Sequence, residues 1–593
     1  MNQKLSNLRA AMSKQGIAAY IIFNTDPHND EYIPREYHIA AALTGFTGEN
    51  ATVVVTQDFA GVWTDGRFYI SGEMELKGTE VSLMKTEGNA KEQSFANYLA
   101  EHLQKGDRVG VDGQLVTDKT YQKIKSLLSA KGITVDNSVD LTATFWTDRP
   151  EPSFSEIYIL DDQYAGLSAS AKIANLRKEN GSAYQVITRL DEVAWLLNLR
   201  ASDIDFCPLF RAFMVVGATD AVLFVHDGRI NSNIKAHLDK SGVAVQKYDD
   251  VYNYLRQLPD NATVRIDHKS ANSFIVSNVN PKCKITDAPS PVQQAKAIKN
   301  ETELRNIRQA LITDGVAMER FFYKLEQKLA NNEPLTEMSL AKMLLEERKK
   351  GKGFISESFG CISAFNGHAA MPHYAPTDES DIPVDGNGVY LVDSGGQYYE
   401  GTTDITRTIA TTKDGRFSDK FALDYTLVLQ GHIELATAIF PEGTTGSQLD
   451  LLARINLWKY GKDFQHGTGH GVGYCLNCHE GPHRISSVHN TVALVPGMIV
   501  TDEPGIYIEN EYGIRTENIV QVVKSEYKGF NKFDVLTLCH IDTRPIVREI
   551  LTEAQLKFVN EYNERVFQTL SPYLDEDEKA YLRERTKCII HNA

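Results

Sequence analysis

The chain contains the segments Val389-Tyr-Leu-Val-Asp393-Ser-Gly-Gly396 and Thr402-Thr-Asp404-Ile-Thr-Arg407, each of which places one carboxylate among apolar or β-branched residues. Asp393 and Asp404 are eleven residues apart, and glycines lie between them. A hairpin of that length can bring two such residues side by side. The pattern therefore predicts a pair of adjacent acids inside a β structure.

A second pair of segments repeats this arrangement about a hundred residues later. The segments read Met498-Ile-Val-Thr-Asp-Glu503-Pro-Gly505 and Gly513-Ile-Arg-Thr-Glu517-Asn-Ile519. Between the two pairs lies the glycine-rich motif His466-Gly-Thr-Gly-His470-Gly-Val-Gly473. We expect Glu503 and Glu517 to lie on adjacent strands, as the first two acids do.

Four carboxylates that face each other inside a protein repel strongly, so they must be protonated or paired with cations. Two divalent metal ions about 3.5 Å apart would satisfy this requirement. Oxygen donors with one imidazole suit Mn²⁺ or Co²⁺ better than metals that prefer thiolates, and Zn²⁺ is a further alternative. The competing interpretation is that these residues are surface acids in ordinary hairpins.

Length and composition limit the other classes of function. A chain of 593 residues predicts three or four domains, and its net charge of −16 argues against nucleic-acid binding. No apolar run approaches the roughly 20 residues of a membrane span. The first residues lack the apolar segment of a signal peptide, and seven scattered cysteines do not form a disulfide framework. We expect a cytoplasmic protein without a membrane or nucleic-acid partner.

Two proline-rich segments predict linkers between domains, at Thr147–Ser153 and Asp287–Pro291. The segments before and after the first linker resemble each other, which predicts duplicated α/β domains. The matched pairs are Asn7-Leu8-Arg9 with Asn175-Leu176-Arg177, Ala18–Phe23 with Ala183–Ile187, and Ala51–Val55 before Asp65-Gly66-Arg67 with Ala221–Val225 before Asp227-Gly228-Arg229. The alternative is a chance similarity between two α/β segments.

The third part of the chain begins with an amphipathic helix that Asn300 can cap, with Glu303 three residues on. More helix is expected to about Lys350. Short β runs with glycine turns then continue to about Val523, and the tail after Asn531 is again largely helical. The predicted domains are 1–148, 154–287, 292–530 and 531–593.

At this point a resemblance to a known family becomes specific. The residues expected to bind metal match the five ligands of the pita-bread metallopeptidases; they are Asp393, Asp404, His470, Glu503 and Glu517. The resemblance implies an α/β (α+β) fold class. It comprises two duplicated creatinase-like N-terminal α/β domains, then a pita-bread catalytic domain with a curved antiparallel sheet and a C-terminal helical extension.

Within that family the chain looks like the long, three-domain, cytosolic form of aminopeptidase P, or Xaa-Pro aminopeptidase. The supporting segments are Glu31-Tyr-Ile33, Trp63-Thr-Asp-Gly-Arg67, Leu190-Asp-Glu-Val-Ala-Trp-Leu-Leu-Asn-Leu-Arg200, Pro372-His-Tyr-Ala-Pro376 and His479-Glu-Gly-Pro482. The rival enzyme is prolidase, which accepts only dipeptides. The rival outside the enzymes is a pseudoenzyme that binds proteins. Chain length disfavours methionine aminopeptidase, and the intact ligand set disfavours creatinase.

The resemblance also implies roles for the site residues. Asp393 binds one metal through both oxygens, Asp404 and Glu517 bridge the two metals, and His470 and Glu503 complete the second site. A metal-bridging hydroxide attacks the peptide bond between the first residue and a following proline. Glu503 moves its proton, while His373 and His479 assist at the carbonyl oxygen. The expected partners are peptides with proline at position two and a second copy of the chain, as a homodimer.

Four further residues are expected to line the proline pocket: His466, Arg515, Tyr507 and Phe359. His466 and His470 are four residues apart, but the glycines around them argue against a helical zinc motif. Arg515 shares a strand face with Glu517. Cys475-Leu-Asn-Cys478-His479 has the spacing of a haem attachment site. We interpret Cys478 instead as a residue that packs beside the proline pocket.

Overall fold

The computed structural model describes residues 3–86 and 94–589 of the chain. These residues form two compact units. One comprises residues 1–161 and 167–293, and the other comprises residues 162–166 and 294–593. The individual boundaries predicted at 148, 154, 287 and 531 stay predictions, and the predicted limits at 1 and 593 lie outside the described residues.

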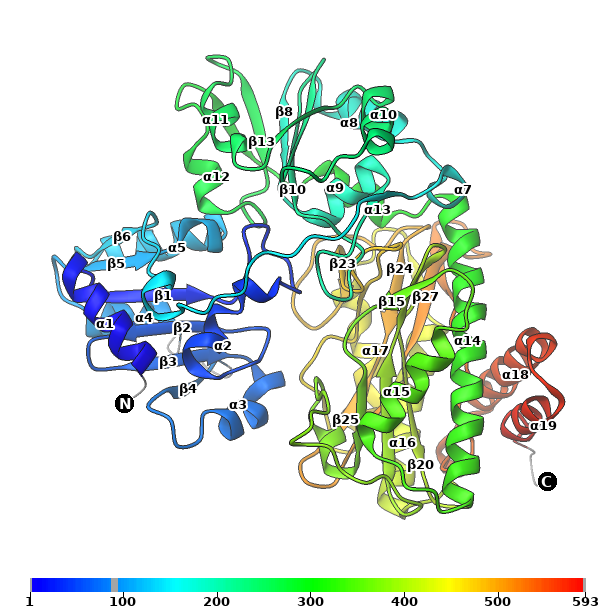
Figure 1. Ribbon diagram of the computed structural model, residues 1–593. Helices are drawn as coiled ribbons and strands as arrows, with labels where there is room; N and C mark the ends of the chain where they lie inside the picture. Colours follow the sequence, from blue (N-terminus) through cyan, green and yellow to red (C-terminus); the bar gives the residue numbers. More distant parts are fainter. Residues whose placement is uncertain (1–2, 87–93, 590–593) are drawn as a thin grey trace. The chain divides into compact units, whose positions relative to one another are not determined.

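In the N-terminal unit, two sheets of six described strands have the same order and directions (Figure 1). Their central strands are rich in buried Val, Ile and Phe, the residue types that suit a pleated sheet. The first sheet runs β4 (Ser82–Lys85), β3 (Ala60–Thr64), β2 (Thr52–Thr56), β1 (Ala19–Phe23), β5 (Arg108–Val111) and β6 (Thr134–Asp136). The second runs β12 (Ala244–Lys247), β11 (Ala221–Val225), β10 (Ala212–Val216), β8 (Tyr184–Ile187), β13 (Thr263–Ile266) and β14 (Lys284–Asp287).

Both sheets pair their second and third strands antiparallel and their outer strands parallel. The predicted duplication is therefore confirmed. Helices accompany each sheet, and polar side chains at Ser94, Thr117, Ser168, Asn231 and Asn272 cap five of them. The helices are α1 (Gln3–Gln15), α2 (Ile39–Thr44), α3 (Tyr69–Glu75), α4 (Phe95–His102), α5 (Asp118–Ser129), α6 (Thr142–Phe145), α8 (Ala169–Asn180), α9 (Leu190–Leu197), α10 (Ser232–Lys240), α11 (Asp250–Arg256) and α12 (Ser273–Ser277). Helix α13 (Pro291–Ala297) begins in this unit and ends in the other.

One of the predicted matches between the repeats is wrong. The strand expected at Ala51–Val55 is β2, which lies next to the central β1. Its counterpart by position in the sheet is β10, whereas Ala221–Val225 is β11 and corresponds to β3. The mistake arose because three successive antiparallel strands have similar apolar runs, and only the pairing order distinguishes them.

The C-terminal unit is built from two helix pairs and two antiparallel sheets. Helices α14 (Glu301–Ala330) and α15 (Glu337–Arg348) pack on the sheet β16 (Ile362–Phe365), β17 (Val389–Ser394) and β20 (Ile405–Ala410). Asn300 and Glu303 form the predicted capping box at the start of α14. Helices α16 (Asp419–Ala436) and α17 (Gly446–Trp458) pack on the other sheet.

That second sheet runs β21 (Ile439–Pro441), β28 (Phe530–Val535), β27 (Asn518–Lys524), β24 (Ile499–Asp502), β22 (Gly469–Gly471) and β23 (Glu480–Ile485). Smaller ladders join β15 (Phe354–Glu357), β18 (Gly396–Tyr398) and β19 (Gly401–Thr402), and β25 (Gly505–Ile508) with β26 (Tyr512–Arg515). A short helix, α7 (Asp162–Ala165), also belongs to this unit, whereas the ladder β7 (Tyr158–Ile159) with β9 (Leu199–Arg200) belongs to the N-terminal one. Each half of the C-terminal unit thus has one helix pair covering one antiparallel sheet.

One expectation for this unit is wrong, and the expected helical tail is confirmed only from Glu553 on. The region from Gly353 to Val523 contains α16 and α17 as well as short strands. Most of α16 is buried and apolar, so its sequence lacks the polar face that reveals a surface helix. The tail after Asn531 first completes β28, and helix resumes only at α18 (Glu553–Leu570) and α19 (Glu576–Arg585), which pack beside α14 (Figure 1).

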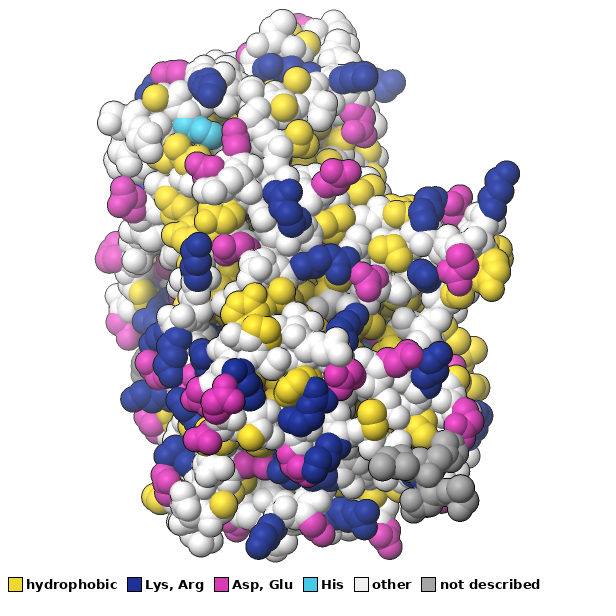
Figure 2. Space-filling view, turned by 90° about the vertical axis from the view of Figure 1, so that its right-hand side faces the viewer, with side chains coloured by type: hydrophobic (Ala, Val, Ile, Leu, Met, Phe, Trp, Pro, Cys, Tyr) yellow, Lys and Arg dark blue, Asp and Glu magenta, His cyan; other side chains and the backbone are white. Residues whose placement is uncertain are grey.

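The face of the molecule drawn in Figure 2 carries charges of both signs. On the face in Figure 2, Lys and Arg side chains are interspersed with Asp and Glu and do not form one continuous basic patch. Among the described helices, none is long and apolar enough to cross a bilayer.

Candidate metal centre

Four of the five residues expected to bind metal, the acids, come from matching places in the two sheets. Asp393 lies near the end of β17, and Asp404 directly precedes its antiparallel neighbour β20. Glu503 directly follows β24, and Glu517 directly precedes its antiparallel neighbour β27. In an antiparallel pair, the end of one strand lies beside the start of the next. The two acids of each pair therefore lie at the same end of their ladder.

A backbone hydrogen bond joins the two halves at this point. The Glu517 N–H donates to the Thr406 carbonyl oxygen at 3.2 Å, so the start of β27 lies against β20. Both pairs of acids therefore face the same space.

His470 on β22 faces the acids with the nitrogen that a metal ligand needs. Its Nδ1 lies 2.8 Å from the carbonyl oxygen of Gly471, and a carbonyl only accepts, so Nδ1 carries the hydrogen. Its Nε2 lies 3.3 Å from Asp404 Oδ2 and 3.6 Å from Glu503 Oε1. Fixing the tautomer through the other ring nitrogen is how proteins orient a metal-binding histidine.

The donor atoms meet the distances expected of a metal site. Asp404, His470 and Glu517 each offer one ligand atom, and the three atoms lie within 4.8 Å of one another. Asp393 is also buried, and its Oδ1 has no hydrogen-bond partner among the described residues. Buried polar atoms are rarely left unpaired, so this oxygen fits a site that a cation completes.

The pKa shifts of the clustered carboxyl groups also fit a site that binds cations. Burial, with the nearby Asp404 and Glu503 carboxylates, raises the pKa of Glu517 well above its usual range. Burial likewise raises the pKa of Glu503 and of Asp393. Burial also opposes ionisation of Asp404, but the adjacent His470 ring lowers its pKa. Divalent cations between these oxygens would relieve the repulsion, so the residues present fit the predicted metal ions.

Three of the predicted pocket residues form one hydrogen-bonded chain beside the acids. Arg515 Nη1 donates to the Tyr507 hydroxyl at 2.5 Å. That hydroxyl lies 2.7 Å from His466 Nε2, while His466 Nδ1 donates to the carbonyl oxygen of Gly467 at 2.7 Å. The Tyr507 O–H therefore donates to His466 when the ring is neutral.

The same arginine connects this chain to the acids. Arg515 Nη2 donates to Asp393 Oδ2 at 2.5 Å, and His466 Nδ1 lies 3.9 Å from Glu503 Oε2. Burial is the main cause that lowers the pKa of His466 to about 3, with the Arg515 charge next. Burial raises the pKa of Tyr507 to about 12. Both groups are therefore neutral at pH 7.

The two histidines predicted to assist at the carbonyl lie at the edge of this cluster. The His479 ring stands perpendicular to the His470 ring, with their centroids 4.2 Å apart. His373 follows Pro372, whose carbonyl oxygen accepts from Arg515 Nη2 at 3.4 Å. Both positions suit contact with a substrate, and their roles stay predictions.

Two residues differ from the others in their surroundings. Phe359 is buried, and its neighbour Ser358 hydrogen-bonds to backbone near the first two acids, but the described contacts do not join Phe359 to the other pocket residues. Cys478 is buried, as packing requires, yet its thiol lies 3.2 Å from Asp404 Oδ2 and not against the pocket chain. Burial and the Asp404 charge raise the pKa of this thiol well above its usual range.

Sequence reasoning missed Thr406, which connects the acids to the pocket chain. Its hydroxyl donates to Glu517 Oε2 at 2.6 Å and accepts from Arg515 Nε at 3.0 Å. Strand alternation could have predicted this role. Thr406 is two residues after Asp404, so the two side chains lie on the same face of the strand.

Comparison with known proteins identifies the family. The model of metallopeptidase family M24 matches residues 305–524, and that of the C-terminal region of peptidase_M24 matches residues 529–589. The Creatinase/Prolidase N-terminal domain matches at residues 4–149 and again, in a second form, at 148–303. Aminopeptidase P2 of Arabidopsis thaliana is 36% identical over 97% of this chain and 86% of its own length. The chain belongs to metallopeptidase family M24.

Two relatives from Caenorhabditis elegans match this M24 chain along its whole length. Xaa-Pro aminopeptidase app-1 is 36% identical over 99% of both chains. The crystal structure of an X-prolyl aminopeptidase, described as a cytosolic enzyme with a di-nuclear active site, is 34% identical with a TM-score of 0.94 over 99% of both chains. The predicted family and fold, with repeated creatinase-like domains and a metallopeptidase domain, are confirmed.

The neutral state of His466 gives a testable prediction. Because the pKa of its ring is lowered to about 3, the metal-free protein should show no titration of His466 between pH 5 and 8. The measurement is NMR of protein labelled at histidine Cε1, with the resonance assigned by its loss in His466→Gln. The urea-unfolded protein is the control, since its histidines titrate near 6.5. A midpoint near 6.5 in the folded protein would contradict the buried, neutral ring.

Proposed function

We propose that this M24 metallopeptidase is a Xaa-Pro aminopeptidase, which removes the first residue of a peptide whose second residue is proline. The observation that carries the proposal is the meeting of four acids and His470 beside the chain of His466, Tyr507 and Arg515. The full-length relatives named for this activity support it.

The metal ions would lie among Asp393, Asp404, His470, Glu503 and Glu517. When bound, two divalent ions would supply an activated water and polarise the scissile carbonyl. We propose Mn²⁺, because carboxylate oxygens with one imidazole suit it, with Co²⁺ and Zn²⁺ as alternatives. Asp404 and Glu517 would both hold these ions, because each comes from a different sheet and their ligand atoms lie within 4.8 Å of each other and of that of His470.

The remaining residues would bind the peptide and move protons. Glu503 would take a proton and deliver it to the departing proline nitrogen, because its carboxylate lies between His470, at 3.6 Å, and His466 of the pocket chain, at 3.9 Å. His479 and His373 would donate to the carbonyl oxygen as negative charge develops on it. The His466–Tyr507 pair would form a wall for the proline ring, held in place by Arg515.

The alternatives are less well supported. Full-length relatives carry the aminopeptidase name, which disfavours prolidase. The five ligands are all present and brought together, whereas a pseudoenzyme has no need to retain them. We propose a cytoplasmic location, in line with the cytosolic enzyme from C. elegans.

Peptide specificity is the most direct test of the activity. Arg-Pro-Pro-Gly should lose its N-terminal Arg in the presence of Mn²⁺. Replacing the first proline by alanine should lower the rate about 30-fold, because about 2 kcal/mol of apolar ring contact is lost. Liquid chromatography of the products measures both rates.

The same assay with two further substrates distinguishes an aminopeptidase from a prolidase. Acetylation of the α-amino group should abolish cleavage, because a free amine is needed at the closed end of the site. An Arg-Pro dipeptide tests prolidase: cleavage of the dipeptide with no cleavage of the tetrapeptide would favour prolidase. Equal cleavage of acetylated and free peptide would rule out an aminopeptidase.

His479→Ala should lower turnover by roughly 10²–10³, the usual loss for a donor to a developing oxyanion. The metal content, measured by mass spectrometry, should match that of the parent, because His479 is not one of the proposed ligands. The exposed His489 provides the control, and His489→Ala should retain parent turnover. Loss of bound metal in His479→Ala would make this residue a ligand instead.

The proposed homodimer has a candidate surface on α17. Large apolar side chains at helical spacing are exposed there: Leu451 (46%), Ile455 (37%) and Trp458 (49%), with Tyr460 (48%) just beyond the helix. A cluster of this kind on a soluble domain marks an interaction site. The face is continuous along one side of the helix, as a self-complementary interface requires.

The double variant Leu451→Asp/Ile455→Asp should shift the protein from dimer to monomer, because charges would be buried at the interface. Sedimentation velocity measures the oligomeric state across a concentration series. Tyr573→Asp replaces another exposed apolar residue of the same unit and should remain dimeric. A parent protein that is monomeric at all concentrations would contradict the proposed dimer.

A further inference from the structure

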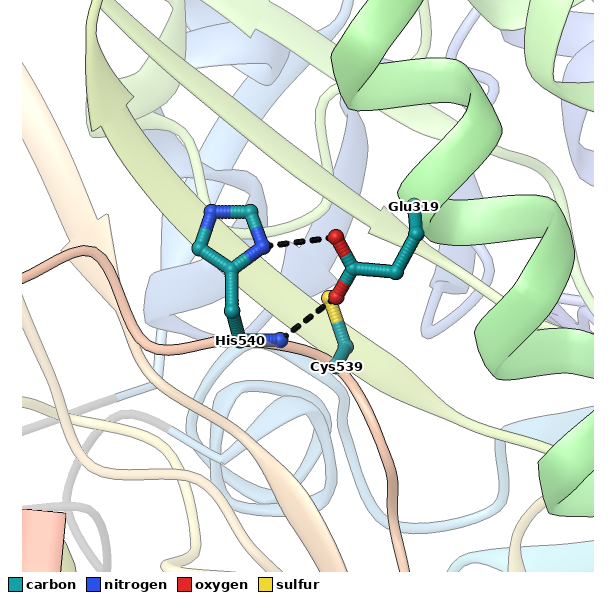
Figure 3. A group of neighbouring side chains, drawn as sticks. All are labelled: Glu319, Cys539 and His540. Atoms are coloured by element: carbon teal, nitrogen blue, oxygen red, sulfur yellow. Dashed lines mark hydrogen bonds and ion pairs between the residues drawn. The ribbon is translucent and has the colours of Figure 1, made fainter. Parts of the chain in front are cut away.

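A second group of potential metal ligands lies outside the proposed metal centre, and Figure 3 shows its three side chains. It consists of Glu319 on α14 with Cys539 and His540, all of them buried. Glu319 Oε1 accepts from the His540 backbone N–H at 2.8 Å, and Oε2 lies 2.8 Å from His540 Nδ1. Both carboxylate oxygens of Glu319 are thus already hydrogen-bonded to His540, so we interpret the group as an anchor for the Cys539–His540 backbone.

This anchor holds two carbonyl oxygens against one buried arginine. Arg407 Nη2 donates to the carbonyl oxygen of Cys539 at 2.7 Å, and Nε donates to that of His540 at 3.0 Å. Arg407 lies on β20, and only 4% of it is exposed. The Cys539–His540 backbone, which Glu319 positions, therefore holds one side of the Arg407 guanidinium. This group is planar and its donors have fixed directions.

The other side of the same guanidinium supports a proposed metal ligand. Arg407 Nη1 donates to the carbonyl oxygen of Glu517 at 2.7 Å and to that of Thr406 at 3.0 Å. Its Nη2 also donates to Asn518 Oδ1 at 2.9 Å. One rigid group thus joins the backbone of Glu517, just before β27 of one sheet, to β20 of the other sheet, which directly follows Asp404.

We propose that Arg407 is a positioning residue for Glu517, and that Glu319 acts through His540 to hold Arg407 in place. The inference rests on the proposed two-metal site. Groups behind the ligands of metal sites commonly change metal affinity by about 10- to 100-fold, because small displacements of a ligand spoil its geometry. Arg407 contacts the backbone carbonyl oxygen of Glu517, so it would position the residue without binding the carboxylate that would hold a cation.

The test is the Mn²⁺ affinity of the metal-free protein, measured from the electron paramagnetic resonance signal of free Mn²⁺. Arg407→Lys keeps the positive charge but loses the fork of donors. It should weaken binding of at least one Mn²⁺ ion about 10- to 100-fold. At saturating Mn²⁺, kcat should fall while KM for the peptide stays near the parent value, because Arg407 does not face the pocket chain.

A matched control separates positioning from stability. Arg348 is equally buried in the same unit, and it donates to Asp314 through Nε at 2.8 Å and Nη2 at 3.2 Å. Arg348→Lys should lower the melting temperature but retain parent Mn²⁺ affinity. Glu319→Gln is the second variant, and it should weaken Mn²⁺ binding in the same direction as Arg407→Lys. If Arg407→Lys does not fold, Glu319→Gln decides the question alone.

Parent-like Mn²⁺ affinity in a folded Arg407→Lys or Glu319→Gln protein would overturn the inference. Equal weakening in Arg348→Lys would overturn it too, because any buried arginine would then have the same effect. Either result leaves the proposed function intact if the parent binds Mn²⁺ and cleaves the peptide. A parent protein that binds no Mn²⁺ would contradict the two-metal site itself, and this inference with it.

Discussion

Electrostatic repulsion among four buried carboxylates is the constraint on which the rest of this catalytic unit depends. Asp393, Asp404, Glu503 and Glu517 reach one space because each pair stands at the end of an antiparallel ladder. Such a cluster is unfavourable unless cations are present, and the raised pKa of Glu517 expresses that cost. The acids stay close in spite of this repulsion because the packing of the helix-covered sheets holds the strand ends together.

The residues around the four acids form two groups, one on the side of the pocket chain and one on the side of the packed core. On the pocket side, Arg515 links Asp393 to Tyr507 and through it to His466. On the core side, Arg407 is bound by backbone carbonyl oxygens and reaches the backbone of Glu517. Two buried arginines therefore bracket the cluster, one beside the space for substrate and one in the packed interior.

Much of the fold could be predicted from the sequence, and each wrong prediction has a physical cause. The box formed by Asn300 and Glu303 was predictable because capping is a local interaction. Helix α16 was missed because it is buried on most sides and has no polar face. The strands at 51–55 and 221–225 were equated wrongly because consecutive apolar strands look alike until their pairing is known.

By itself, the sequence determined the residue types of the metal centre, their order and the family, because ligand chemistry and strand patterns are local properties. Only the tertiary structure decided that Arg515 binds Asp393, that Thr406 joins Arg515 to Glu517, and that the Glu319 anchor supports Arg407. These contacts join residues more than a hundred positions apart. Their partners are backbone carbonyls or single side chains, which leave no spacing pattern in the sequence, so only the packing of the whole C-terminal unit brings them together.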